Sequence, residues 1–254
     1  MTTIAVTGSA GGIGGAIRAR IEAAGHDVLG VDVRDAEVIA DLSSADGRAA
    51  ACAEITAETS GALDGLVVAA GIGGSTEAPS SMVARINYFG AVALLEGLRE
   101  QLAAGQLEAA VAIASNSATA VPVVDSTLVD QCLAGDEEAA ARTAEDMDGE
   151  GVYAFAKLAL ARKVRRLAVE WAPGIRVNAV APGPVLTPLT RAALEHPITG
   201  DLIRSFPIPM DRWGEQTEIA EAVWFLLSPQ SSWTTGAVLF VDGGTDALLN
   251  PDRL

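Results

Sequence analysis

The stretch TIAVTGSAGGIGGA at residues 3–16 decides the fold class of this chain. Its apolar first five residues predict a buried strand, which leads into a turn with glycines at Gly8, Gly12 and Gly14. A helix that begins at such a turn presents free N–H groups and the positive end of its dipole to an anion. Glycine is required because side chains would block the approach of a pyrophosphate and the close packing of the helix. The stretch therefore predicts a dinucleotide-binding β-α unit.

The rest of the chain repeats this alternation of apolar strands and alanine-rich helices. The strands are apolar throughout, which is typical of a parallel sheet buried on both faces. We predict one α/β domain over residues 1–254, a Rossmann-type doubly wound parallel sheet of about seven strands with helices on both faces. The expected strands are 3–7, 28–32, 38–41, 65–70, 109–114, 175–181 and 237–242, and the expected helices are 12–24, 47–59, 82–104, 152–171 and 216–228.

Two segments interrupt the alternation. Residues at about 118–150 are acidic and rich in alanine, and we expect them to form helices beside the site opening or at a subunit contact. Residues at about 184–214 are rich in proline and are interpreted as a substrate lid, because long loops in compact domains are usually functional. Each apolar residue of that lid could instead fill the core: Leu189, Leu194, Phe206, Met210 and Trp213.

Composition excludes several classes of partner and site. The formal net charge is -16, so nucleic acid and anionic membranes are poor partners. Cys52 and Cys132 form no cluster with the two histidines, so we expect no metal site and read both as small buried hydrophobic residues. The beginning MTTIAVTG resembles no leader, no apolar run reaches membrane-spanning length, and a cytoplasmic protein is expected.

Acidic residues after the second and third predicted strands bear on the cofactor. Asp32 ends the second strand, where a carboxylate binds both ribose hydroxyls and repels a 2′-phosphate. This favours NAD over NADP, although the nearby Arg34 weakens the preference. Asp41 either contacts the adenine ring or is an ordinary turn residue.

The candidate chemistry lies in YAFAK, residues 153–157. Tyr153 and Lys157 are four residues apart, so they share one face of the predicted helix. Oxidation of an alcohol needs a base for the hydroxyl proton, and an adjacent ammonium lowers the pKa of a phenol from about 10. Alone the pattern is typical of any helix. Ser115 follows an apolar strand and is the preferred donor to the substrate oxygen, with Ser117 as the competing serine.

Together these motifs resemble the short-chain dehydrogenase/reductase family along nearly the full chain. The match rests on the glycine-rich turn, Asp32, Gly71, Asn87, Ser115, Tyr153 with Lys157, and Pro182-Gly183 followed by Thr187. The stretches at 31–43, 86–91 and 240–248 resemble one branch, the bacterial 3α-hydroxysteroid dehydrogenase/carbonyl reductases. Two departures stand out. Residues 68–71 read VAAG where many members have NNAG, and the interval from Ser115 to Tyr153 is longer than usual.

The resemblance implies roles for individual residues. Tyr153 would be the general acid/base, Lys157 its partner and a ligand of the nicotinamide ribose, and Asn87 part of a water relay. The implied cofactor contacts are Gly8, Ala10, Gly12, Ile13, Gly14, Asp32, Asp41, Leu42, Ala70, Gly71, Tyr153, Lys157, Pro182, Gly183, Val185 and Thr187. A homo-oligomer, either a dimer or a tetramer, is also implied.

Three functions remain open on the sequence alone. The first is NAD-dependent interconversion of a secondary alcohol and a ketone, with 3α-hydroxysteroids as the first substrate hypothesis. The second keeps this chemistry for a terpenoid or another cyclic alcohol. The third is a dinucleotide-binding regulator without catalysis, which the intact set of Ser115, Tyr153, Lys157 and Asn87 argues against.

Overall fold

The computed structural model of the protein describes residues 2–74, 77–122, 125–195 and 199–252. A seven-stranded sheet of order β3-β2-β1-β4-β5-β6-β7 runs through it, and every pair of neighbouring strands is parallel. The predicted fold class is confirmed. The strands are β1 (Thr3–Thr7), β2 (Asp27–Asp32), β3 (Val38–Ile39), β4 (Gly65–Val68), β5 (Ala109–Ile113), β6 (Arg176–Pro182) and β7 (Val238–Val241).

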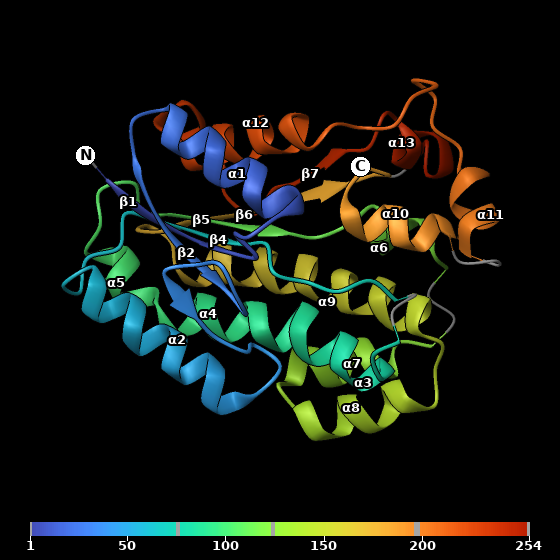
Figure 1. Ribbon diagram of the computed structural model, residues 1–254, viewed down its shortest axis with the longest axis horizontal. Coiled ribbons are helices and arrows are strands. Elements are labelled where there is room, and N and C mark those ends of the chain that lie inside the picture. Colours follow the sequence, from blue (N-terminus) through green and yellow to red (C-terminus); the bar gives the residue numbers. More distant parts are fainter. Residues whose placement is uncertain (1, 75–76, 123–124, 196–198, 253–254) are drawn as a thin grey trace.

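Helices cover both faces of this sheet (Figure 1). Helices α1 (Gly12–Ala23) and α12 (Gln216–Leu227) lie on one face, and α2 (Ala45–Glu58), α4 (Ala91–Gly97) and α9 (Gly149–Glu170) lie on the other. Successive side chains of a strand point to opposite faces. In β1, Ile4 and Val6 accordingly pack with α1 and α12, while Ala5 joins the larger core beneath α4 and α9.

The helix predicted at 82–104 is instead divided into four parts. They are α3 (Ser80–Ala84), the π-helix η1 (Arg85–Gly90), α4 and α5 (Arg99–Ala103). Within η1 the Asn87 amide donates a hydrogen bond to the Val83 carbonyl oxygen, the acceptor that a regular α-helical N–H would use. Gly97, a weak helix former, precedes the break at Leu98. A π-helical turn is frequent at functional sites.

Strands β3 and β4 each end two residues earlier than predicted. β4 stops at Val68 rather than residue 70, because the N–H groups of Ala69 and Ala70 donate to the Thr7 hydroxyl and not to a neighbouring strand. β3 stops at Ile39 rather than residue 41, since the chain turns at Asp41 toward helix α2. Both differences arise from side-chain hydrogen bonds that compete with the strand ladder.

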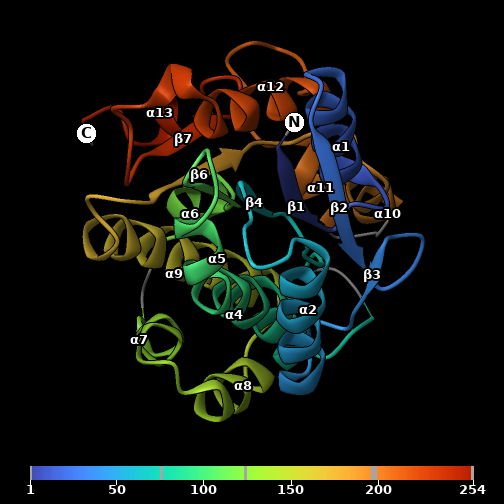
Figure 2. The same ribbon diagram turned by 90° about the vertical axis from the view of Figure 1, so that its left-hand side faces the viewer.

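Most of the described part of the segment at 118–150 forms helices, as predicted. It contains most of α6 (Ser117–Ala120), α7 (Thr127–Ala134), α8 (Glu137–Glu145) and the first residues of α9. Figure 2 shows α7 and α8 beyond α4 and α9, on the side away from the sheet. Glu137 accepts bonds from Arg48 of α2 and Arg85 of η1, so ion pairs fasten this layer to the rest of the protein.

The segment at 184–214 contains two short helices, α10 (Pro188–Glu195) and α11 (Thr199–Arg204), at the end toward which the strands point (Figure 1). Its two ends are joined, because the Gly214 N–H donates to the Pro184 carbonyl oxygen over 3.0 Å. Leu194, Phe206 and Trp213 are half-buried and Met210 is exposed, while the Leu189 side chain lies outside the described part.

The C-terminal part follows α12 with a short 3-10 helix η2 (Pro229–Ser231), then β7 and α13 (Thr245–Leu249). Thr245 donates to the Pro207 carbonyl oxygen over 2.7 Å, which ties α13 to the end of the 184–214 segment. Of the helices in the described residues, none has the length and apolar character needed to cross a membrane.

Candidate active site

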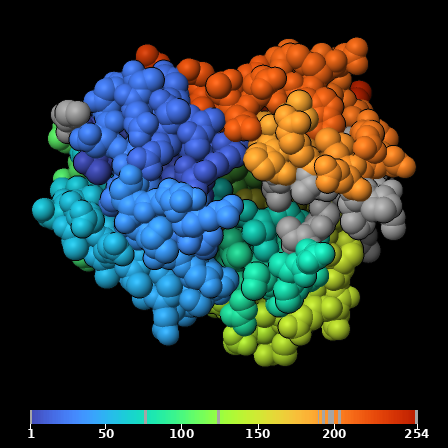
Figure 3. All heavy atoms as spheres, viewed as in Figure 1, coloured from blue at the N-terminus to red at the C-terminus, as the bar shows by residue number. Residues whose placement is uncertain are grey.

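The predicted site residues gather at one edge of the sheet, where the parallel strands end. Gly8 follows β1, Ser115 follows β5 after one alanine, and Gly183 follows β6. This edge is where open α/β sheets bind their ligands. Figure 3 shows the surface hollowed between the blue N-terminal part and the orange C-terminal part.

The glycine-rich turn is packed so tightly that two of its glycines are sterically required. A Cβ on Gly14 would lie 2.1 Å from the Gly8 carbonyl oxygen, and a Cβ on Gly8 would lie 2.9 Å from the Ala70 Cα. Gly12 has φ +57°, and no atom lies within 4 Å of the place its Cβ would take. Bare backbone at the beginning of α1 thus faces open space, as a pyrophosphate site needs.

Asp32 is part of this turn. One of its carboxylate oxygens accepts from the Ala10 N–H over 3.0 Å, and the other accepts from the Val33 N–H over 2.7 Å. The carboxylate therefore lies against the glycine-rich backbone. Asp41 accepts from the Ser43 side chain and N–H, which lower its pKa, so its predicted turn interpretation has direct support. The next residue, Leu42, is buried.

A chain of hydroxyl groups connects α6, β5 and α9. Ser117 donates its hydroxyl to Ser115 Oγ over 2.9 Å, and its N–H donates to the same oxygen over 3.2 Å. Tyr153 on α9 is close enough for the Ser115 side chain to influence its pKa. Burial raises the pKa of Tyr153, and Ser115 acts against this rise. The sequence left a choice between the two serines, and the structure joins both in one network.

Lys157 lies one turn along α9 from Tyr153, with Nζ 5.8 Å from the tyrosine ring centroid. It is only 4% exposed, and Nζ donates to the Ile113 carbonyl oxygen over 2.8 Å. Burial lowers the pKa of Lys157 to about 8. The expected lowering of the Tyr153 pKa by Lys157 is not found, because burial dominates at Tyr153 and Lys157 holds its own proton less firmly.

Asn87 and Gly71 complete the buried end of the site. The Asn87 amide donates to the Ile72 and Val83 carbonyl oxygens, whereas its Oδ1 is buried with no partner in the described part of the chain. A Cβ on Gly71 would lie 2.5 Å from that Oδ1 and 3.5 Å from Lys157 Nζ. The missing side chain at Gly71 thus leaves room beside Asn87 and Lys157.

The segment after β6 forms the last wall. A Cβ on Gly183 would lie 2.7 Å from Asp242, so β6 and β7 end in close contact. Val185 pairs with Gly214, and Thr187 is nearly buried with its hydroxyl next to that of Thr190. The Pro182 carbonyl oxygen accepts from the Asn116 N–H, which joins this wall to the serine segment.

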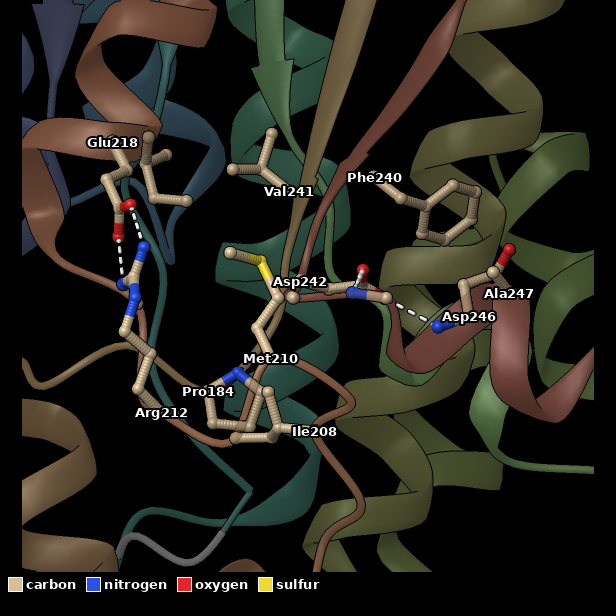
Figure 4. A pocket seen from close by; sticks show the side chains of 14 residues that line it. Pro184, Ile208, Met210, Arg212, Glu218, Phe240, Val241, Asp242, Asp246 and Ala247 are labelled. Carbon is tan, nitrogen blue, oxygen red and sulfur yellow. Dashed lines mark hydrogen bonds and ion pairs between the residues drawn. The ribbon is translucent and has the colours of Figure 1, made fainter.

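A pocket of about 450 Å³ lies beyond this wall, between β7, α12 and the end of the 184–214 segment. Figure 4 shows Ile208 and Met210 beside Pro184, with Arg212 paired to Glu218 on α12. Asp242 lies near the middle of the view and Asp246 on its right-hand side, joined by a bond from the Asp246 N–H to Asp242.

Sequence reasoning missed two buried polar atoms near this edge. Ser9 Oγ and Asn116 Nδ2 have no hydrogen-bond partner among the described residues, and both residues are about 95% buried. Ser9 lies within the glycine-rich turn, and Asn116 stands between the two serines. A polar residue inside an otherwise small or apolar motif was the available signal.

Known proteins share this architecture and sequence. The chain is 43% identical to the 3-alpha-hydroxysteroid dehydrogenase/carbonyl reductase of Comamonas testosteroni over the whole of both chains. It matches the crystal structure of 3-alpha-hydroxysteroid dehydrogenase from Pseudomonas sp. B-0831 complexed with NADH, with a TM-score of 0.97 and 45% identity over 100% of both chains. A structure described as a short chain dehydrogenase/reductase family protein matches with a TM-score of 0.69, 28% identity and 97% of both chains covered. The chain belongs to the short-chain dehydrogenase/reductase family.

A family model described as Enoyl-(Acyl carrier protein) reductase also matches residues 139–246. That range contains α9 with Tyr153 and Lys157, and the wall after β6. The resemblance inferred from the motifs of this short-chain dehydrogenase/reductase is therefore confirmed, for the family and for the hydroxysteroid dehydrogenase branch.

Proposed function

We propose that this short-chain dehydrogenase/reductase interconverts a secondary alcohol and a ketone with NAD(H). The observation that carries the proposal is the arrangement of Ser115, Tyr153, Lys157 and Asn87 beside the glycine-rich turn. These groups can hold a substrate oxygen, exchange its proton and supply a positive charge at one edge of the sheet.

The residues around the turn are compatible with a dinucleotide. Gly8 and Gly14 make contacts that a side chain would prevent, and Gly12 opens toward free space. The buried, unpartnered Ser9 Oγ is available for a further polar contact. Asp32 would hold the adenosine ribose, and Lys157 the nicotinamide ribose. When bound, the nicotinamide supplies the acceptor or donor of the hydride.

Tyr153 is the residue that exchanges the substrate proton. In the oxidation direction the phenolate oxygen takes the proton of the alcohol, and in reduction the phenol returns it. Ser115 donates a hydrogen bond to the substrate oxygen and stabilises the negative charge that develops there. A protonated Lys157 would favour the phenolate against the opposing effect of burial. The Asn87 Oδ1, which has no partner among the described residues, offers an acceptor on the route from Lys157 to solvent.

Hydroxysteroids are the first substrate hypothesis, since two full-length relatives are described as 3α-hydroxysteroid dehydrogenases. A bulky apolar substrate would lie under the 184–214 segment, where Leu194, Phe206 and Trp213 are half-buried. The same wall would accept a terpenoid or another cyclic alcohol. These alternatives differ only in the substrate, so a panel of alcohols separates them.

A homo-oligomer remains part of the proposal. Trp233, in the turn that precedes the edge strand β7, is fully exposed, and Leu239 of β7 is 36% exposed, so both offer apolar surface to a second copy. Light scattering, which measures the mass of the protein in solution, tests whether it forms a homo-oligomer. The cytoplasmic location stays a prediction.

Replacing Tyr153 by phenylalanine tests the catalytic assignment. The Tyr153→Phe variant keeps the ring but has no exchangeable proton, so kcat/KM for hydroxysteroid oxidation should fall by about a thousandfold or more. NADH binding, followed by its fluorescence, should remain. Near-normal turnover in this variant would refute the assignment, and loss of NADH binding would point to a structural role instead.

A further inference from the structure

Ser117 occupies both acceptor positions of Ser115. A serine hydroxyl has one hydrogen to donate and two lone pairs to accept with. The Ser117 hydroxyl donates to Ser115 Oγ over 2.9 Å, and the Ser117 N–H donates to the same atom over 3.2 Å. Ser115 can then take part in one further bond only as a donor, and its remaining neighbour in the site is Tyr153.

The short helix that carries Ser117 is fixed from the C-terminal end of the chain. Thr119 of α6 donates to Asp246 of α13 over 2.5 Å, and Asn250 donates to the same carboxylate oxygen over 3.0 Å. The Asp246 N–H donates in turn to Asp242 at the end of β7 (Figure 4). A helix of four residues has little stability of its own, so these bonds hold Ser117 in place.

We propose that Ser117 is a positioning residue that makes the Ser115 hydroxyl a one-way donor toward the Tyr153 and substrate oxygens. The inference rests on the proposed function and deepens it. The Ser117 hydroxyl donates to Ser115. A Ser115 hydroxyl that donates to Tyr153 would continue this chain in the same direction, and such chains strengthen each member. Without Ser117, the Ser115 hydroxyl can turn and accept a hydrogen bond from the Tyr153 hydroxyl, which stabilises the neutral phenol.

Charged groups near Tyr153 also bear on its pKa. Glu150 on the same helix raises the pKa of Tyr153, and Lys157 lies 5.8 Å from its ring centroid. Asp246 of α13 faces α6 through Thr119, and η1 contributes Arg85, which pairs with Glu137 and Glu138 away from the hydroxyl chain. Removing the Ser117 hydroxyl changes none of these charges.

The experiment compares Ser117→Ala with Ser117→Thr, Ser115→Ala and the double alanine variant. Ser117→Ala should lower kcat/KM for alcohol oxidation by about fivefold, the size of one neutral hydrogen bond. It should also move the acid limb of the pH profile to higher pH, and Ser117→Thr should restore both. In the Ser115→Ala background, Ser117→Ala should change kcat/KM by less than about twofold, because the Ser115 hydroxyl on which Ser117 acts is absent. Ser232→Ala, which removes an exposed hydroxyl beyond η2, is the matched control.

A second readout needs no substrate. The chain has two tyrosines, and burial also raises the pKa of Tyr88, so in the Tyr88→Phe variant tyrosinate absorbance reports Tyr153 alone. Ser117→Ala should shift this titration to higher pH. An unmoved titration, or an equal loss of activity with and without Ser115, overturns the inference while the proposed function stands. A wild-type enzyme that oxidises no alcohol refutes the proposed function, and the titration still decides the inference.

Discussion

Two buried cations, Arg48 and Lys157, are held in opposite ways. Arg48 is 5% exposed and lies 2.6 Å from Glu137 of α8, so its charge is neutralised by a carboxylate. Lys157 is 4% exposed and donates to a neutral carbonyl oxygen, with no ion pair found for it in the described part of the chain. Burial alone shifts its pKa, downward to about 8.

This difference separates a structural charge from a functional one. A buried ion pair can fasten one segment to another, and removing one partner leaves the other charge uncompensated. A buried charge without a partner lowers stability, and it is retained where chemistry requires it. Arg48 thus ties the 118–150 segment to α2, whereas Lys157 lies beside Tyr153 with a pKa that burial lowers.

Of changes to the two buried cations, replacing Lys157 by methionine should have the larger effect on activity. The Lys157→Met variant keeps the length of the side chain but removes the charge next to Tyr153, so kcat/KM should fall by about a hundredfold or more. Lys163→Met is the matched control, because Lys163 lies on the same helix, pairs with Glu96 and is outside the site. Comparable losses in both variants would mean that the charge of α9, and not the position of Lys157, matters.

The same variant should be more stable than the wild type at neutral pH. The pKa of Lys157 is about 8 in the folded protein against an ordinary value of 10.5, a gap that corresponds to about 3 kcal/mol of destabilisation. Below pH 8 both states bind the proton and the whole penalty is present. Between pH 8 and 10.5 only the unfolded chain binds it, so wild-type stability rises with pH and the advantage of the variant disappears. Urea unfolding at several pH values measures this, and a constant difference would contradict the assigned pKa.

Part of this arrangement was predictable from the sequence. The strands and the glycine-rich turn could be predicted, because apolar runs and bare glycines leave few alternatives for the backbone. The division of the 82–104 helix was not, since it depends on where the Asn87 amide finds its acceptors, Val83 and Ile72. Ile72 lies in another segment of the chain, and spacing carries no information about such a bond.

The site shows the same limit. The motifs predicted that Ser115, Tyr153 and Lys157 act together, and the structure brings them to one edge. They did not predict the direction of hydrogen bonding from Ser117, nor the tie from Thr119 to Asp246, because these residues are 127 positions apart. The pKa of Tyr153 was expected to fall and rises in the structure, since burial can be judged only once the fold is known.

Glu137 and Glu138 allow the paired cation to be tested with a close control. Both carboxylates lie in the first turn of α8 and pair with Arg85 over 2.7 Å. Replacing either one by glutamine therefore removes a negative charge that interacts favourably with the helix N-terminus. Only Glu137 also neutralises the buried Arg48. Glu137→Gln should therefore lower the free energy of unfolding by about 3 kcal/mol, and Glu138→Gln, at a side chain 71% exposed, by less than about 0.5 kcal/mol. Urea unfolding gives both values, with NADH affinity as a check that the site is intact. Equal losses would show that the helix terminus, rather than the Arg48 pair, holds the 118–150 segment in place.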